Sequence, residues 1–105
     1  MTKIKFFGYD GVITGFEITG HSTSSVNDNE GKIVCSAVSS AAYLTANTLI
    51  EVIGADVKAK VGDGFMKIEL KSLFEDSQIT LQGFLLHAKE LSKQYRNYIK
   101  VYSEV

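Results

Sequence analysis

The sequence contains no proline, no tryptophan and only one cysteine, Cys35, among its 105 residues. A single cysteine excludes a disulfide within the chain and a cysteine-rich metal site, and it fits a protein of the reducing cytoplasm. Without a proline-marked linker or an internal repeat, nothing in the sequence marks a domain boundary, and the length suits one folding unit. We therefore expect a single domain over residues 1–105.

The sequence also lacks a strong charge of one sign and a long apolar run. Eleven basic and twelve acidic side chains give a formal net charge of -1, whereas nucleic-acid-binding domains usually show a marked basic excess. No apolar run has the length that a signal peptide or a transmembrane helix needs. We expect a cytoplasmic protein that contacts neither nucleic acid nor a membrane directly.

Alternating apolar residues and turn signals predict five strands, and apolar residues three and four positions apart predict two helices. The strands are expected at about residues 2–9, 12–19, 57–61, 66–70 and 98–102. The first helix should begin after Gly31 and end near Gly54, and the second should cover about residues 75–95. Asp10-Gly11 predicts a tight hairpin between the first two strands, and Gly62-Asp63-Gly64 a turn between the next two.

The element order ββαββαβ favours an α+β fold, a two-layer sandwich in which a mainly antiparallel five-stranded sheet has both helices on one face. The other sheet face would meet water or a second copy of the chain. Both strands of the second hairpin should be half-buried. The core-facing helix positions are expected to be Val34, Val38, Ala41, Thr45, Leu49 and Val52 in the first helix, and Ile79, Leu81, Leu85, Leu86, Ala88 and Leu91 in the second.

Cys35 and His21 are the candidate catalytic pair. Cys35 is expected in the first turn of its helix or just before it, where exposed N–H groups stabilise a thiolate. His21 follows Gly20 at the end of the second strand, so an imidazole could take the thiol proton. The polar tract at residues 22–30 predicts a mobile loop that closes over the pair.

Two other interpretations compete with a catalytic cysteine. Free cysteine often serves as a small buried apolar residue, although the small residues after Cys35 and the polar loop before it favour an accessible thiol. Cys35, His21 and Asp28 are also metal-ligand types, but three such residues fall short of a zinc site. We expect no metal and no cofactor, and we assign no role to His87.

The pattern around Cys35 resembles the bacterial ribosomal-processing cysteine proteases (Prp-like). That family carries Gly-His, a loop, and then Asp-Ile-Val-Cys, a small residue and Ala-Val-Ser; here the corresponding residues are Gly20-His21 and Ile33-Val34-Cys35-Ser36-Ala37-Val38-Ser39. The resemblance covers essentially the whole chain, because the length and the element order also fit.

The resemblance implies a cysteine endopeptidase that removes the N-terminal extension of a large-subunit ribosomal protein precursor, ribosomal protein twenty-seven, and that forms a homodimer. It implies that Cys35 is the nucleophile and His21 the general base. Gly20 would shape the turn that presents His21, and Ser39 would lie one helical turn beyond Cys35 on the same face.

One position departs from the family pattern: Lys32 stands where the family carries an aspartate. An acid there would cap the helix or orient the histidine, and a lysine can do neither. Lys32 would instead favour a thiolate by its positive charge, while Asp28 or Glu30 would replace the acid. If neither happens, the alternative is a non-catalytic ribosome-associated binding or assembly module on the same fold.

Overall fold

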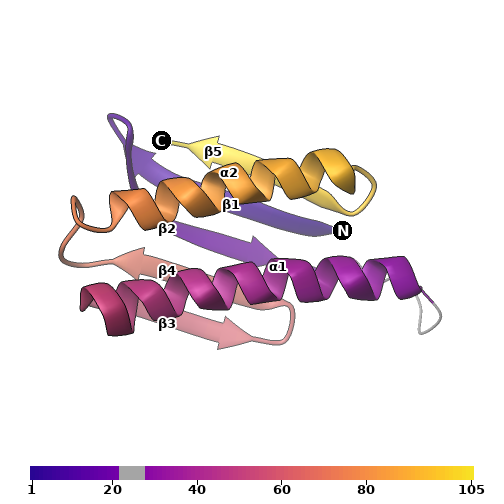
Figure 1. Cartoon of the computed structure of the whole chain (residues 1–105), viewed down its shortest axis with the longest axis horizontal. Helices are drawn as coiled ribbons and strands as arrows, with labels where there is room; N and C mark the ends of the chain where they lie inside the picture. Colours follow the sequence, from indigo (N-terminus) through magenta and orange to yellow (C-terminus); the bar gives the residue numbers. More distant parts are fainter. Residues whose placement is uncertain (22–27) are drawn as a thin grey trace.

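The computed structural model describes residues 1–21 and 28–105. The structure confirms the predicted ββαββαβ order (Figure 1). One π-helical segment, η1, is added after the first helix. The elements are β1 (Thr2–Tyr9), β2 (Val12–Thr19), α1 (Asn29–Asn47), η1 (Thr48–Ile53), β3 (Val57–Gly62), β4 (Phe65–Leu70), α2 (Gln78–Gln94) and β5 (Ile99–Glu104).

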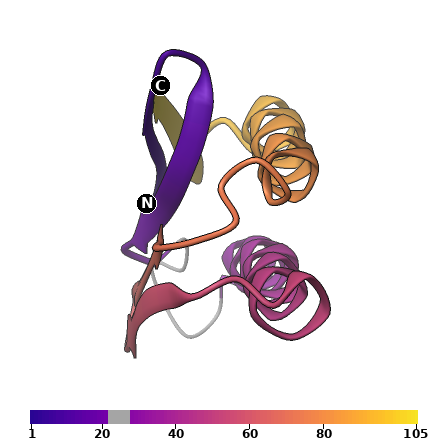
Figure 2. The same ribbon diagram turned by 90° about the vertical axis from the view of Figure 1, so that its left-hand side faces the viewer.

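The five strands form one sheet in the order β3-β4-β2-β1-β5. Among the described strands, the β1–β5 pair is parallel and the other three neighbouring pairs are antiparallel. Both helices cover the same face of the sheet, and the opposite face is open (Figure 2). The predicted two-layer α+β sandwich is therefore confirmed.

The hairpin between β1 and β2 turns at Asp10 and Gly11, as predicted. Asp10 has φ 51° and Gly11 has φ 79°, the left-handed values that both central residues of a type I′ turn adopt. This turn suits the right-handed twist of the two strands. A register shift between Phe7 and Gly8 then sets Lys5 opposite Glu17.

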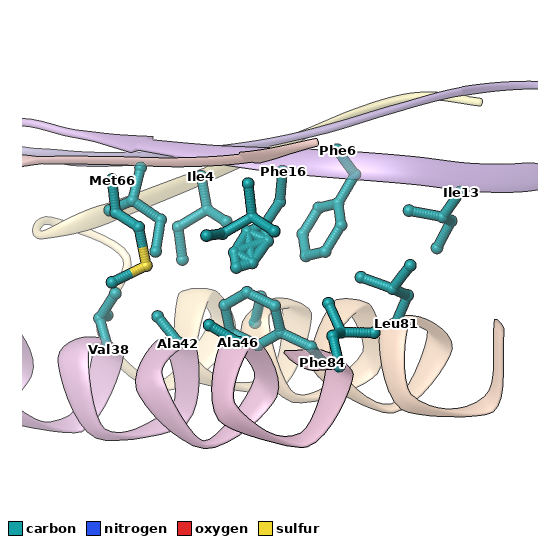
Figure 3. Close-up of a cluster of buried hydrophobic side chains, with 14 of the residues drawn as sticks. Ile4, Phe6, Ile13, Phe16, Val38, Ala42, Ala46, Met66, Leu81 and Phe84 are labelled. Atoms are coloured by element: carbon teal, nitrogen blue, oxygen red, sulfur yellow. The ribbon is translucent and has the colours of Figure 1, made fainter. Parts of the chain in front are cut away.

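An aromatic cluster joins the sheet to α2 (Figure 3). The ring of Phe84 lies 5.4 Å from that of Phe6 and 4.9 Å from that of Phe16, both in edge-on geometry. The prediction for α2 was wrong at Ile79 and Leu86, which are 88% and 63% exposed. The buried stripe runs instead through Leu81, Phe84, Ala88 and Leu91 at steps of three and four residues, which turns the other two outward.

Helix α1 begins earlier than predicted. Asp28 is its N-cap, and the Asp28 carboxylate accepts a hydrogen bond of 2.9 Å from the Gly31 N–H, so residues 29 and 30 are helical. Cys35 is consequently in the second turn of α1, and the expectation of a first-turn position was wrong. The remaining part of the predicted mobile loop, residues 22–27, lies outside the described residues.

The end of this helix is a π-helical turn that stops at Gly54, with φ 79°. The extra residue in a π turn rotates the positions that follow it relative to an α-helix. Val52, predicted to face the core, is 79% exposed as a result, whereas Ile53 packs against the core.

The continuous helical segment Asn29–Ile53 has 25 residues and contains an 18-residue window with a mean hydropathy of 1.5, so it meets the length and composition of a membrane span. The expectation that no run approaches that length was therefore wrong. The side chains of Val38, Ala42 and Ala46 point from this helix into the core beneath the sheet (Figure 3). A core helix of a globular domain has the same length and composition.

The edge strand β3 was expected to be half-buried, but nearly all of it is exposed because it has a neighbouring strand on one side only. Its charged side chains share the open face with those of the other strands. Two like-charged pairs sit directly opposite each other there: Lys60 faces Lys67 between β3 and β4, and Lys3 faces Lys100 between β1 and β5. Such pairs destabilise a sheet.

We predict that Asp28→Ala lowers the free energy of unfolding by about 1 kcal/mol, because the Gly31 N–H loses its acceptor at the helix start. Asp28→Asn keeps an acceptor oxygen and should lose less. Urea denaturation followed by circular dichroism compares the variants. Equal stability of the alanine and asparagine variants would contradict the capping role.

Candidate active site

A cleft of about 250 Å³ lies between α1 and the β3–β4 hairpin, next to the end of β2. It brings together four of the residues singled out in the sequence, from two elements. Gly20 and His21 reach it from the end of β2, and Cys35 and Ser39 from α1. Its floor is apolar, built by Ile18, Val38, Ala42, Phe65 and Met66.

Cys35 and Ser39 are four residues apart on α1, so both side chains lie on one face of the helix. Cys35 is half-buried and forms no disulfide. It borders the cleft and stands outside the buried core, which is the placement of an accessible thiol.

The helix start does not assist this thiol in the way that the sequence suggested. Only the first four N–H groups of an α-helix lack a partner within the helix, and Cys35 is beyond them. Its backbone N–H is at a position where the helix itself supplies the acceptor. The unpaired N–H groups at the helix start are therefore not the groups that stabilise a thiolate at this sulfur.

His21 is held by its own backbone at the cleft rim. Gly20 has φ 89°, a conformation that favours glycine, and its N–H donates to the Gly64 carbonyl at 2.9 Å. The His21 carbonyl accepts a 2.7 Å hydrogen bond from the Met1 ammonium group. These contacts hold the backbone of Gly20 and His21, and so they fix the position from which the His21 side chain extends.

The acid beside His21 is Asp63, in the turn between β3 and β4. Its Oδ1 atom lies 3.6 Å from the imidazole Nε2 atom, and the Asp63 side chain is almost fully exposed. Local sequence signals marked residues 62–64 only as a turn. Finding this acid requires knowing that β4 pairs with β2, which sets Phe65 opposite Thr19 and brings the turn to His21.

Asp28 and Lys32 are not among the described residues that line the cleft. Lys32 is exposed in the first turn of α1. Asp28 caps that helix and accepts a hydrogen bond from the Tyr98 hydroxyl. Burial raises the pKa of the Tyr98 hydroxyl above its usual value, and the negative charges of Asp28 and Glu30 raise it further.

A larger groove of about 660 Å³ runs between α1 and α2. His87 borders it, together with small and apolar side chains such as Leu44 and Phe84. No thiol or carboxylate accompanies His87 among the described residues of this groove. The smaller cleft at Cys35 is therefore the candidate active site.

Within residues 1–21 and 28–105, no three histidine, cysteine or acidic side chains gather as a metal site. The chemistry available in the cleft is that of a thiol, an imidazole and a carboxylate. This combination suits nucleophilic attack by sulfur with an imidazole as the base.

The family model described as cysteine protease Prp matches residues 1–100 of the chain. Among solved structures, the Streptococcus mutans protein SMU.848 is 26% identical, with a TM-score of 0.87 over 99% of this chain and 94% of that one. The ribosomal processing protease Prp of Staphylococcus aureus, solved with a covalently linked product peptide, is 18% identical. Its TM-score is 0.85, over 99% of this chain and 100% of that one. A comparison with curated proteins finds no match.

We predict that stability falls as the pH rises above about 10, in part because of Tyr98. Its pKa is raised in the folded state, so its contribution is complete below the unfolded pKa and is lost as the pH rises through the folded pKa. Tyr98→Phe should show a shallower alkaline loss than the wild type. Thermal unfolding between pH 8 and pH 11 compares the two, and parallel curves would exclude this contribution.

Proposed function

This chain belongs to the cysteine protease Prp family, and from that membership we propose that it is the endopeptidase that removes the N-terminal extension of ribosomal protein twenty-seven. The observation that carries the proposal is the single cleft that Cys35, His21 and Asp63 share. The Staphylococcus aureus relative, a ribosomal processing protease also solved with a substrate peptide, supports the substrate class.

In this proposal Cys35 is the nucleophile and His21 the general base. The imidazole takes the proton from Sγ, and the thiolate attacks the carbonyl carbon of the scissile peptide bond. As the tetrahedral intermediate collapses, the C–N bond breaks and the imidazolium gives its proton to the leaving amine. Water, activated by the same imidazole, then hydrolyses the thioester and restores the thiol.

The substrate oxyanion needs hydrogen-bond donors, and Cys35 supplies none from its own helical N–H. Ser39 is the hydroxyl one turn along the same helix face, at the cleft. We assign its O–H as a donor to the substrate carbonyl. Gly20 acts through the backbone, because its left-handed conformation sets the direction of His21.

The shape of the cleft favours an apolar side chain next to the scissile bond. Its floor is made of Ile18, Val38 and Met66, and the hollow is about the size of one or two side chains. An apolar residue placed there gains about 25 cal/mol for each Å² of buried apolar surface. Peptides with an apolar residue beside the cleavage point should therefore be the better substrates.

The non-catalytic alternative rested on Lys32 replacing a family acid. Lys32 is outside the cleft, and the acid beside His21 comes from the β3–β4 turn. The substitution at position 32 therefore removes no carboxylate from the candidate site, and no observation favours the alternative. The cytoplasmic location, the homodimer and the absence of a cofactor remain predictions from the sequence.

We predict that Cys35→Ala abolishes cleavage of a peptide that spans the precursor junction, because the sulfur forms the covalent bond to the substrate. Cys35→Ser should be nearly inactive, since a hydroxyl is a weaker nucleophile without stronger base assistance. Mass spectrometry of the peptide products measures turnover.

The matched control is Ser36→Ala, a neighbouring exposed position on α1 outside the cleft, which should cleave at the wild-type rate. Thermal unfolding confirms that each variant is folded. Turnover by folded Cys35→Ala would overturn the assignment of the nucleophile.

A further inference from the structure

We propose that the Asp63-Gly64 turn is the positioning element for His21: the Asp63 carboxylate holds the imidazole at Nε2 and leaves Nδ1 as the base. The inference rests on the proposed function, because it assigns a role within that reaction. Asp63 acts through His21, and so it is a positioning residue.

The first support is the geometry of the contact between Asp63 and His21. Asp63 Oδ1 lies 3.6 Å from His21 Nε2, so the carboxylate faces this particular ring nitrogen. Among the side chains of residues 1–21 and 28–105, it is the one acid within 4.0 Å of the imidazole. Asp28, the acid expected in this role, is engaged at the start of α1.

The second support is independent of charge, because the backbone of Gly64 is shaped to admit the ring. Gly64 has φ 65°, and a Cβ atom added there would lie 2.6 Å from His21 Nε2 and 3.1 Å from Cδ2. Any side chain at position 64 would therefore displace the imidazole. The Gly64 carbonyl also accepts the hydrogen bond from the Gly20 N–H, so this turn holds the backbone before His21 as well as its ring.

The chemical consequence is the choice of tautomer. A neutral imidazole carries one proton, and a carboxylate facing Nε2 favours the proton on that nitrogen. Nδ1 then has the lone pair that accepts the thiol proton, and the resulting imidazolium keeps its Nε2–H toward the negative charge of Asp63. In this step one proton moves from Sγ to Nδ1, and no proton is transferred to Asp63.

The turn supplies from the β3–β4 hairpin what the family pattern places before Ile-Val-Cys. This chain has Lys32 at that position, on the exposed side of α1, where it does not border the cleft. The acid for His21 therefore comes from a segment about 30 residues further along the chain, on the opposite wall of the cleft.

The expected effect of Asp63 is modest, since the pair is open to water. Exposed pairs of this kind are weak, so we expect Asp63 to change the ratio of the two His21 tautomers by about fivefold at most. We expect Asp63→Ala to lower kcat about fivefold with little change in KM. Asp76→Ala, which removes an exposed acid before α2, should leave kcat unchanged and is the matched control.

Nitrogen-15 NMR of histidine-labelled protein reads the tautomer directly and needs no activity. We expect wild-type His21 to be mainly protonated at Nε2, and Asp63→Ala to shift population toward Nδ1–H. A His87→Gln variant assigns the two histidine signals. An unchanged His21 tautomer in Asp63→Ala would overturn the inference, even if the protein is an active protease.

Gly64→Ala tests the second support. The added methyl group should displace the imidazole and lower kcat by about tenfold or more, as misplaced catalytic groups do. Gly11→Ala is the control for backbone strain, because Gly11 also has positive φ but nothing lies within 4 Å of an added Cβ. Full activity of folded Gly64→Ala would contradict the inference that Gly64 leaves the space in which the His21 ring is positioned.

These outcomes separate the inference from the proposed function. If folded Cys35→Ala still cleaves the peptide while the tautomer shift occurs in Asp63→Ala, the nucleophile is wrong and the positioning by Asp63 stands. If Cys35→Ala is inactive but the tautomer does not respond to Asp63→Ala, the protease assignment stands and the positioning is wrong.

Discussion

The packing of α1 on the sheet is the interaction on which the site depends. Val34, Val38 and Ala42 are buried under the sheet, and this stripe fixes the rotation of the helix about its axis. Cys35 and Ser39 each follow a buried valine by one residue, which is a rotation of about 100° toward the side of the helix. The core thus places the thiol at the rim of the cleft.

Much of this arrangement is readable from the sequence, because it follows from short-range periodicity. The alternation of apolar and polar residues predicted the strand positions, and β1 and β2 begin and end at the predicted residues. The Asp10-Gly11 turn has the predicted conformation. Cys35 and His21 were identified from their chemistry and from a family pattern, and the fold sets both beside one cleft.

The features that were missed depend on longer-range contacts or on local exceptions. The start of α1 is set by Asp28, a capping side chain inside a tract that otherwise reads as a loop. The exposed position of Val52 reflects a π turn, which the α-helical period cannot describe. Asp63 reaches His21 only through the pairing of β4 with β2, whose partners are distant in the chain.

The opposed lysines on the open face make the outer strands sensitive to ionic strength. Both pairs involve an edge strand, because Lys60 belongs to β3 and Lys100 to β5. Salt weakens the repulsion between such opposed lysine charges, because the Debye length is about 8 Å at physiological ionic strength. In dilute buffer the repulsion acts in full, so the edges of the sheet should fray first, while the strands between them stay paired. One of these two edge strands is β3, which forms part of the wall of the cleft at Cys35.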